Sequence, residues 1–158
     1  MAQLNPTSKR FRDAASALGL DVEVHELAES SRTAEEAAAA CGCAVGQIVK
    51  SLVFKGADSE RPILLLVSGA NRVDQKGVAK QIGEALVRPD AQFVRDVTGY
   101  AIGGIPPLGH KQSLTTYIDE ELLDHETIWA AAGTPSSVFP TTGAALREAA
   151  DAKVIALK

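Results

Sequence analysis

The sequence predicts a single α+β domain built around a mixed β-sheet. Helical and strand-like segments alternate along the chain, and several of the later strand-like segments are joined by connections too short to hold a helix. The 158 residues are 46% hydrophobic and 23% charged, which is enough to bury one core. Because no linker or repeat interrupts the pattern, we treat residues 1–158 as one domain.

Helical periodicity and capping residues predict five helices. The clearest start is a capping box in which Thr33 precedes Glu36 by three positions, and Gly42 follows the alanine run as a stop. The five predicted helices span residues 5–19, 33–42, 74–83, 88–99 and 141–150.

Apolar runs between these helices predict the strands. The segment RPILLLVSG, residues 61–69, is apolar almost throughout, which is typical of a strand buried on both faces. Short runs with alternating or β-branched residues predict the others. The predicted strands span residues 21–27, 47–56, 61–69, 113–119, 127–133, 136–140 and 153–157.

Charge and composition exclude several classes of function. The net charge is −4 and the pI about 5.4, whereas binding of duplex DNA needs a broad surface of clustered Lys and Arg. No apolar run reaches the roughly 20 residues that span a membrane, and the N-terminus has no signal-peptide core, so we expect a cytoplasmic protein. Cys41 and Cys43 are one residue apart and the three histidines are scattered, so we expect neither a metal nor another cofactor.

One lysine stands in line with apolar side chains in the strand at 47–56. Because side chains alternate across a strand, Lys50 shares a face with Ile48, Leu52 and Phe54. An ammonium group there either reaches water at the strand edge or points into a pocket that pairs it. The second alternative makes Lys50 a candidate cation in a small-molecule site.

The stretch GGIPPLGHK, residues 103–111, combines the most permissive and the most restricted backbone positions. Glycine allows a ligand to approach the backbone closely, and proline fixes φ and removes an N–H donor. A rigid loop of this kind can hold N–H groups toward a carbonyl or an oxyanion, although a stiff structural turn would have the same composition. The available donors are those of Gly103, Gly104, Ile105, Leu108 and Gly109.

Four stretches taken together resemble the YbaK/ProX family of aminoacyl-tRNA deacylases: VKSLVFKG, LLLVSGANRVDQKGVAK, GYAIGGIPPLGHKQSLTTYIDEELL and IWAAAGTP. The resemblance extends over nearly the whole chain. It implies a mixed, barrel-like fold, that of a free-standing editing domain similar to the insertion domain of bacterial prolyl-tRNA synthetases. It also implies hydrolysis of the ester between a wrong amino acid and tRNA, often the tRNA for proline.

The resemblance assigns roles to particular positions. Lys50 matches the key lysine of the family, and Gly103 and Pro107 match its Gly-x-x-x-Pro loop. In the family no protein nucleophile is required, since a ribose hydroxyl of the terminal adenosine helps to activate water. Many relatives carry Ser or Thr where this chain has Pro106, so the resemblance does not choose between the cysteine-specific and alanine-specific branches.

The resulting hypothesis gathers ten residues around one ester bond. The residues expected to be catalytic are Lys50, Gly103, Gly104 and Ile105. Those expected to bind substrate are Pro106, Pro107, Leu108, Gly109, His110 and Gly133.

The expected partner is the 3′ end of an aminoacyl-tRNA carrying a small amino acid such as Ala, Cys or 2-aminobutyrate, with prolyl-tRNA synthetase as a second candidate partner. Basic side chains that could meet tRNA phosphates are Arg72, Lys76, Lys80 and Lys111. The alternative is a non-catalytic module that binds aminoacyl-tRNA or a nucleotide and partners a synthetase.

Overall fold

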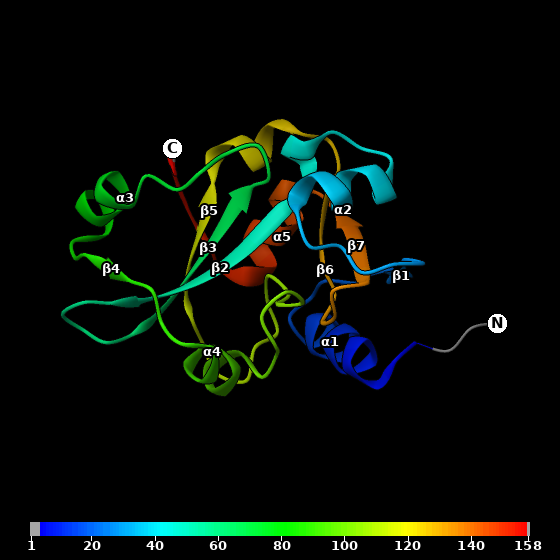
Figure 1. The fold of residues 1–158 in the computed structure, drawn as a ribbon, viewed down its shortest axis with the longest axis horizontal. Coiled ribbons are helices and arrows are strands. Elements are labelled where there is room, and N and C mark those ends of the chain that lie inside the picture. The colour runs from blue at the N-terminus through cyan, green and yellow to red at the C-terminus, as the bar shows by residue number, and fades with distance from the viewer. Residues whose placement is uncertain (1–3, 158) are drawn as a thin grey trace.

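The computed structural model describes residues 4–157 and places five α-helices around two β-sheets within that range (Figure 1). All five predicted helices are confirmed, with slightly shorter bounds. They are α1 (Pro6–Ala17), α2 (Ala34–Cys41), α3 (Gln75–Ile82), α4 (Ala91–Thr98) and α5 (Gly143–Ala150). Two 3₁₀ turns, η1 (Val45–Gln47) and η2 (Glu120–Asp124), connect helix to strand and strand to strand.

The helices begin and end where the capping residues place them. The Asn5 side chain accepts the backbone N–H of Ser8 at 2.8 Å, and the Thr33 hydroxyl accepts that of Glu36 at 3.1 Å. Gly42 closes α2 with φ +69°, a left-handed conformation that costs glycine little.

The larger sheet has the strand order β4-β2-β3-β5-β8. β2 is antiparallel to both β3 and β4, whereas β3, β5 and β8 run parallel, so the predicted mixed sheet is confirmed. The two residues of β4 were not predicted as a strand. The bounds are β2 (Val49–Gly56), β3 (Pro62–Ser68), β4 (Leu86–Val87), β5 (Thr115–Asp119) and β8 (Lys153–Ile155).

The smaller, antiparallel sheet has the order β1-β7-β6, with β1 (His25–Glu26), β7 (Ser137–Thr141) and β6 (Ile128–Ala131). The strand predicted at 21–27 is wrong except for the two residues of β1. Val22 and Val24 pack against the core from an irregular segment, so their alternation reflects burial without strand pairing. The two sheets meet where Ile48, just before β2, forms a parallel bridge to Trp129 of β6.

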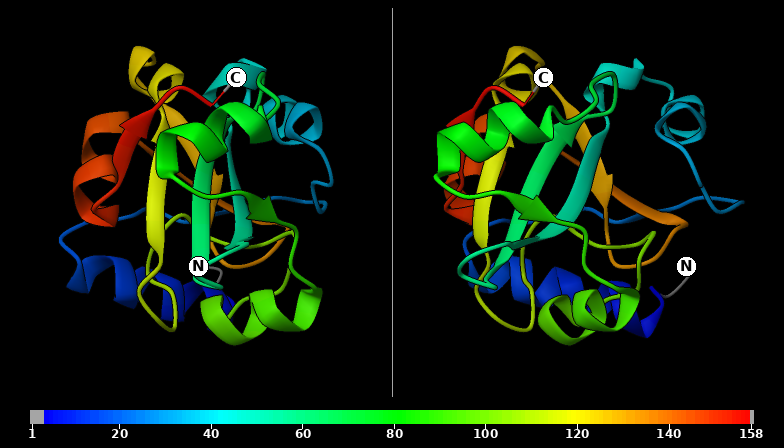
Figure 2. Two further views of the ribbon diagram at one scale, coloured as in Figure 1. Left: turned by 90° about the vertical axis from the view of Figure 1, so that its left-hand side faces the viewer. Right: turned by 60° about the vertical axis from the view of Figure 1, so that its left-hand side comes forward.

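β3 lies at the centre of the molecule, and its two faces are buried as predicted. Leu64 and Leu66 belong to the cluster that contains Phe11 and Phe139, while Leu65 faces a second cluster beneath α3. Figure 2 shows α1 and α4 beneath the sheets, with α2 and α5 at opposite edges of the molecule. None of the helices described within residues 4–157 has the length and apolar character needed to cross a membrane.

Candidate functional site

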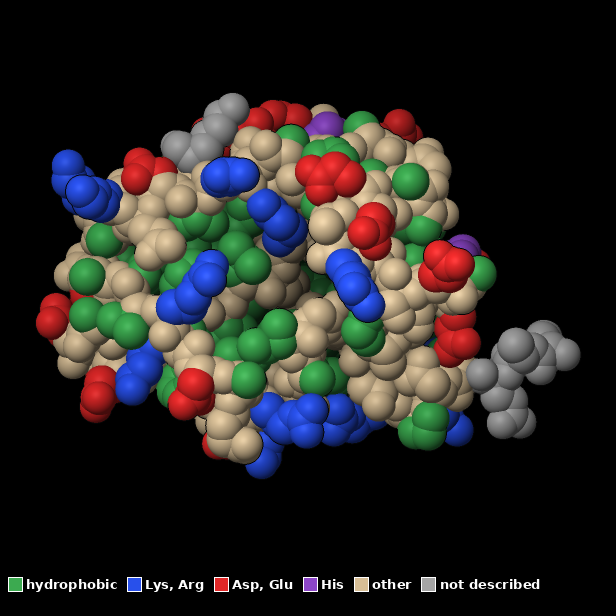
Figure 3. Space-filling view, in the orientation of Figure 1, with side chains coloured by type: hydrophobic (Ala, Val, Ile, Leu, Met, Phe, Trp, Pro, Cys, Tyr) green, Lys and Arg blue, Asp and Glu red, His purple; other side chains and the backbone are tan. Residues whose placement is uncertain are grey.

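A cavity of about 300 Å³ lies at the junction of the two sheets. Its walls come from β2, from the segment that leads into α2, from β6 and β7, and from the loop at 102–105. Much of the lining is apolar, including Ala37, Trp129 and Val138. Figure 3 shows a hollow near the centre of this face, with Lys and Arg side chains around it.

The cavity opens along an edge of β2 that carries no partner strand. On the side away from β3, β4 pairs only with Lys55 and Gly56, so within residues 4–157 no ladder covers this edge from Val49 to Leu52. All residues from 48 to 52 therefore contribute to the lining, whichever face their side chains occupy. Backbone groups of an uncovered edge are available to a ligand.

Lys50 lies in this wall as a half-buried side chain. Its Nζ donates a hydrogen bond to the backbone carbonyl of Asn71. Burial lowers the pKa of Lys50 below its usual 10.5, with the charge of Arg72 acting in the same direction, while Glu35 and Asp119 oppose the shift. Lys50 thus places its amino group at the wall of a largely apolar cavity.

The buried carboxylate of Asp119 accepts a hydrogen bond from Asn71, the residue to whose carbonyl Lys50 donates. The side chain of Asp119 is fully buried at the end of β5, where Oδ2 accepts the backbone N–H of Ser68 at 3.0 Å and Nδ2 of Asn71 at 2.9 Å. Its Oδ1 accepts the N–H of Glu121 at 3.0 Å. Asp119 therefore fixes Asn71, and the carbonyl of Asn71 positions the ammonium group of Lys50.

The first part of the glycine–proline loop faces the same cavity. Gly103 and Ile105 line it together with Lys50, and Gly103 adopts φ +101°. Within residues 4–157, no hydrogen bond engages the N–H of Gly103 or of Ile105, whereas Gly104 donates to the carbonyl of Ala101 at 3.2 Å. Two of the predicted backbone donors therefore belong to residues that line the same cavity as Lys50, and the third closes the turn.

Gly104 is needed because the loop touches another backbone segment. A Cβ at this position would lie 2.6 Å from Cα of Thr134 and 2.8 Å from the carbonyl oxygen of Gly133. Neither backbone atom can give way as the end of a flexible side chain would.

Replacing Gly104 with alanine should destabilise the protein by about 1–3 kcal/mol, because the loop must move off the 133–134 backbone. It should also lower activity by displacing Gly103 and Ile105. Urea unfolding and turnover measure the two effects. Gly83→Ala, where an added Cβ meets nothing within 4 Å, should cost stability through its left-handed φ of +92° but leave turnover unchanged. Equal losses of turnover in both variants would contradict the proposed contact.

The second part of the loop, residues 106–110, lies outside the main cavity. Residues 107–110 line a separate depression of about 260 Å³ with Leu18 and Asp151. Pro106 is buried, and its carbonyl oxygen accepts a hydrogen bond from Nε2 of His110 at 2.7 Å. Residues 106–110 do not line the main cavity, so the structure does not bring them to Lys50.

His110 gives the fold a pH dependence. Burial lowers its pKa below the usual 6.5, and the hydrogen bond to Pro106 partly opposes the shift. Below about pH 6.5 the unfolded chain therefore binds a proton that the folded protein does not, so the free energy of unfolding should fall as pH falls and level off below the folded pKa. Denaturant unfolding between about pH 7.5 and 5.5 measures this. The fall should be smaller in His110→Gln, and an identical profile would contradict it.

Gly133 lies beside a third depression, of about 360 Å³, which it lines with Arg10 and Tyr100. This depression and the main cavity share Thr134 and Pro135. Eight of the ten predicted site residues therefore line one of three hollows, with Lys50, Gly103 and Ile105 in the first, whereas Gly104 and Pro106 line none of them.

Several lining residues were not predicted from the sequence. Trp129 lines the cavity, and the centroid of its ring lies 5.3 Å from that of the His25 ring. Ser51 also lines it, and its hydroxyl is buried without a hydrogen-bond partner in the part of the chain that is described. Asn71 and Asp119 carry no local signal, since their roles depend on pairs far apart in sequence.

No group of three or more His, Cys, Asp or Glu side chains within residues 4–157 is placed to hold a metal ion. Burial, with the neighbouring Cys43, raises the pKa of the Cys41 thiol to about 11, which disfavours the reactive thiolate.

Comparison with known proteins gives the family of this chain. Residues 28–149 match the family model of the aminoacyl-tRNA editing domain. The uncharacterised protein YwhH of Bacillus subtilis (strain 168) is 31% identical over 132 residues, covering 84% of this chain and 83% of that protein. EbsC of Enterococcus faecalis (strain ATCC 700802 / V583), whose name proposes a Cys-tRNA(Pro)/Cys-tRNA(Cys) deacylase, is 32% identical over 108 residues, which cover 66% of this chain and 64% of EbsC.

A crystal structure described as that of a candidate trans-editing enzyme for prolyl-tRNA synthetase superposes with a TM-score of 0.93. The two chains are 44% identical, and the match covers 99% of each. Both the match to the family model and the superposition cover β2 and the loop at 102–105, which carry Lys50 and Gly103. On this basis, the chain belongs to the aminoacyl-tRNA editing domain family.

Proposed function

We propose that this protein hydrolyses mischarged aminoacyl-tRNA in trans, with the tRNA for proline carrying a small amino acid such as Ala, Cys or 2-aminobutyrate as the substrate. The observation that carries the proposal is the convergence of a held ammonium group, Lys50, and two unengaged backbone donors, those of Gly103 and Ile105, on one cavity. These groups suit an ester whose carbonyl oxygen becomes negative as water attacks.

In this proposal the protein orients the ester and stabilises charge, and it forms no covalent intermediate. Lys50 holds a phosphate or the carbonyl of the substrate, and the loop N–H groups hold the developing oxyanion. Water adds to the carbonyl carbon, and the neighbouring ribose hydroxyl of the terminal adenosine assists its deprotonation. Collapse of the tetrahedral intermediate breaks the ester bond, and the ribose oxygen leaves with a proton.

The cavity supports a small aminoacyl group. Its volume of about 300 Å³ is at the low end for small-molecule sites. A nucleoside fills much of this volume, so the apolar wall that includes Ala37, Ala130 and Val138 is left to contact a small side chain. Synthetases discriminate poorly between small apolar amino acids, because one methylene is worth only about 1–3 kcal/mol, so such errors are the ones that need removal.

A deacylation screen tests the proposal. Purified protein is incubated with tRNA for proline charged separately with Ala, Cys, Ser, 2-aminobutyrate or Pro, and the remaining ester is followed over time. We expect rapid release of one or more small noncognate amino acids and protection of Pro. Binding of the charged tRNA without release of any amino acid would overturn hydrolysis and favour the alternative of a non-catalytic binding module.

A further inference from the structure

The third depression, between α1, the end of α4 and residues 133–135, has the character of an anion site. Two arginines from different helices line it, Arg10 of α1 and Arg95 of α4. Figure 3 shows Lys and Arg side chains gathered at the lower edge of this face, over α1 and α4. This positive charge is concentrated on a protein whose net charge is −4.

Arg10 is held in place by the depression itself. Its Nη2 donates to the carbonyl of Gly99 at 2.8 Å, and the guanidinium carbon lies 4.6 Å from the centre of the Tyr100 ring. Tyr100 is buried, so the surface on which Arg10 stacks is fixed. These contacts use only part of the five-donor fork of a guanidinium group, and the remaining donors suit a phosphate.

No acidic side chain neutralises these arginines. Within residues 4–157 neither Arg10 nor Arg95 forms an ion pair, and no Asp or Glu lines the depression. Lys111 adds a third basic residue beside it, since a Cβ on Gly99 would lie 3.4 Å from Cβ of Lys111. Cations without carboxylate partners are an electrostatic footprint of phosphate binding.

Only a thin wall separates this depression from the Lys50 cavity. Thr134 and Pro135 line both hollows. Gly133 lets this turn lie close to α1 and Tyr100, because a Cβ there would lie 3.1 Å from Cγ2 of Thr7 and 3.3 Å from Cε1 of Tyr100. A hydrogen bond of 2.6 Å between the hydroxyls of Thr134 and Ser137 fixes the turn. A ligand in the cavity therefore contacts the same turn that borders the depression.

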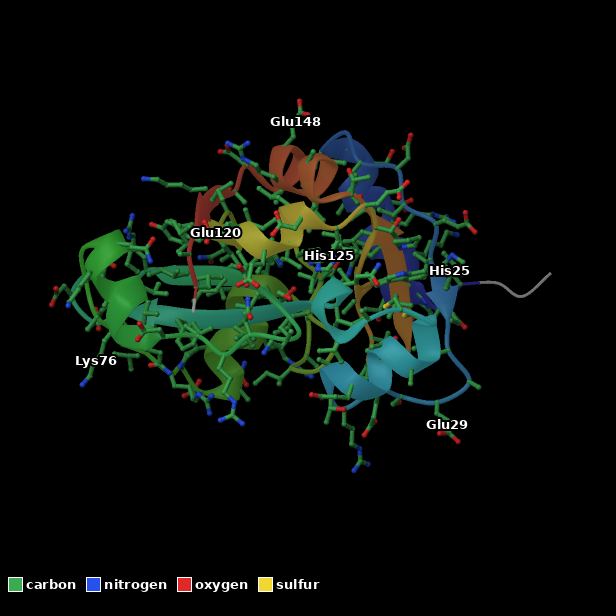
Figure 4. The ribbon with its side chains drawn as sticks, turned by 90° about the horizontal axis from the view of Figure 1, so that it is seen from above. His25, Glu29, Lys76, Glu120, His125 and Glu148 are labelled. Carbon is green, nitrogen blue, oxygen red and sulfur yellow. The ribbon has the colours of Figure 1, made fainter. Side chains whose placement is uncertain are left out.

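We propose that Arg10 and Arg95 bind the backbone phosphate that joins the terminal nucleoside of the acceptor strand to the preceding nucleotide. This inference rests on the proposed function, with the terminal nucleoside and its aminoacyl group in the Lys50 cavity and with Lys50 on the ester carbonyl, which leaves the phosphate to the arginines. The inference also distinguishes the basic residues that contact this phosphate from basic residues that lie elsewhere on the surface. Figure 4 shows Lys76, predicted from the sequence as a phosphate contact, on α3 at the end of the molecule away from α2, and no residue of α3 lines the cavity.

The test compares substrates with and without the phosphate. Wild type, Arg10→Gln, Arg95→Gln and the double variant are assayed on charged tRNA and on adenosine that carries the same aminoacyl ester but no phosphate. We expect each single variant to lose about tenfold in kcat/KM on charged tRNA, as for a hydrogen-bonded charged group, with no change on aminoacyl-adenosine. Arg147→Gln, on α5 and outside the lining of this depression, should match wild type on both.

Full activity of the double variant on charged tRNA would overturn the inference. So would equal losses on both substrates, since the arginines would then only support the cavity. Weaker association with prolyl-tRNA synthetase, at unchanged tRNA activity, would assign the depression to a protein partner and overturn it as well.

A binding experiment tests this inference independently of the proposed hydrolysis. The affinity of each variant for an uncharged acceptor-stem minihelix ending in CCA is measured by fluorescence anisotropy at several salt concentrations. Loss of affinity with a shallower salt dependence in Arg10→Gln and Arg95→Gln supports the phosphate site even if no deacylation is found. Unchanged affinity and salt dependence would overturn it even if deacylation is found.

Discussion

Replacing Lys50 with alanine is expected to lower kcat/KM for the mischarged tRNA by about a hundredfold or more while the fold stays intact. The side chain is only half-buried and its one hydrogen bond is to the carbonyl of Asn71, so its loss costs little stability. The loss of turnover is large because a preorganised cation in a partly dry cavity stabilises charge better than water does. Single-turnover deacylation and circular dichroism measure the two quantities.

Lys55 provides the matched control for this prediction. It lies on the same strand, but its Nζ is 3.7 Å from Oε1 of Glu60 and it does not line the cavity. Lys55→Ala should therefore keep wild-type turnover. Lys50→Met, which retains most of the side-chain length, should be as inactive as Lys50→Ala. Full activity of either Lys50 variant would remove Lys50 from the mechanism.

Replacing Asp119 with alanine is expected to destabilise the fold by about 3–5 kcal/mol, as for a broken buried charged network. The reason is that three donors would lose their acceptor, the N–H groups of Ser68 and Glu121 and the side-chain amide of Asn71. Urea unfolding measures the change. Glu120→Ala alters the exposed neighbouring carboxylate, labelled in Figure 4, and should change stability by no more than about 0.5 kcal/mol.

Asp119→Asn tests whether this network positions Lys50. The variant keeps the shape of the side chain, but its amide nitrogen must face a donor, which disturbs Asn71 and so the ammonium group of Lys50. We expect kcat to fall at a temperature where the variant is fully folded, while the affinity for uncharged tRNA stays unchanged. Wild-type kcat in a folded Asp119→Asn protein would show that the network supports the fold alone.

Local patterns were sufficient for most of the architecture. The Thr33 and Gly42 caps, the fully apolar β3 and the helical periodicities each depend on nearby residues, and the structure confirms them. The strand predicted at 21–27 is wrong except for its two-residue remnant, β1, and the two residues of β4 were missed, because such pairing depends on a partner far along the chain. Periodicity reports burial, and burial does not require a strand.

Two residues of the candidate site were also predictable from local patterns. Lys50 stands out locally as a charge among apolar neighbours, and Gly103 stands out by composition. The chain of hydrogen bonds from Asp119 through Asn71 to Lys50 connects β5, β2 and the loop that follows β3. It is therefore visible only in the folded structure. The burial of Leu108 in the core likewise explains why the loop turns away from the cavity after Ile105.

The shared wall at Thr134 and Pro135 has a consequence for the evolution and engineering of specificity. Because the same short turn borders both hollows, a substitution there reshapes the space for the amino acid and the path of the tRNA together. Variants selected at Thr134 for a larger amino acid should therefore also change in tRNA preference. Substitutions at Ala37 or Val138, which line only the first hollow, offer the route by which one property can change alone.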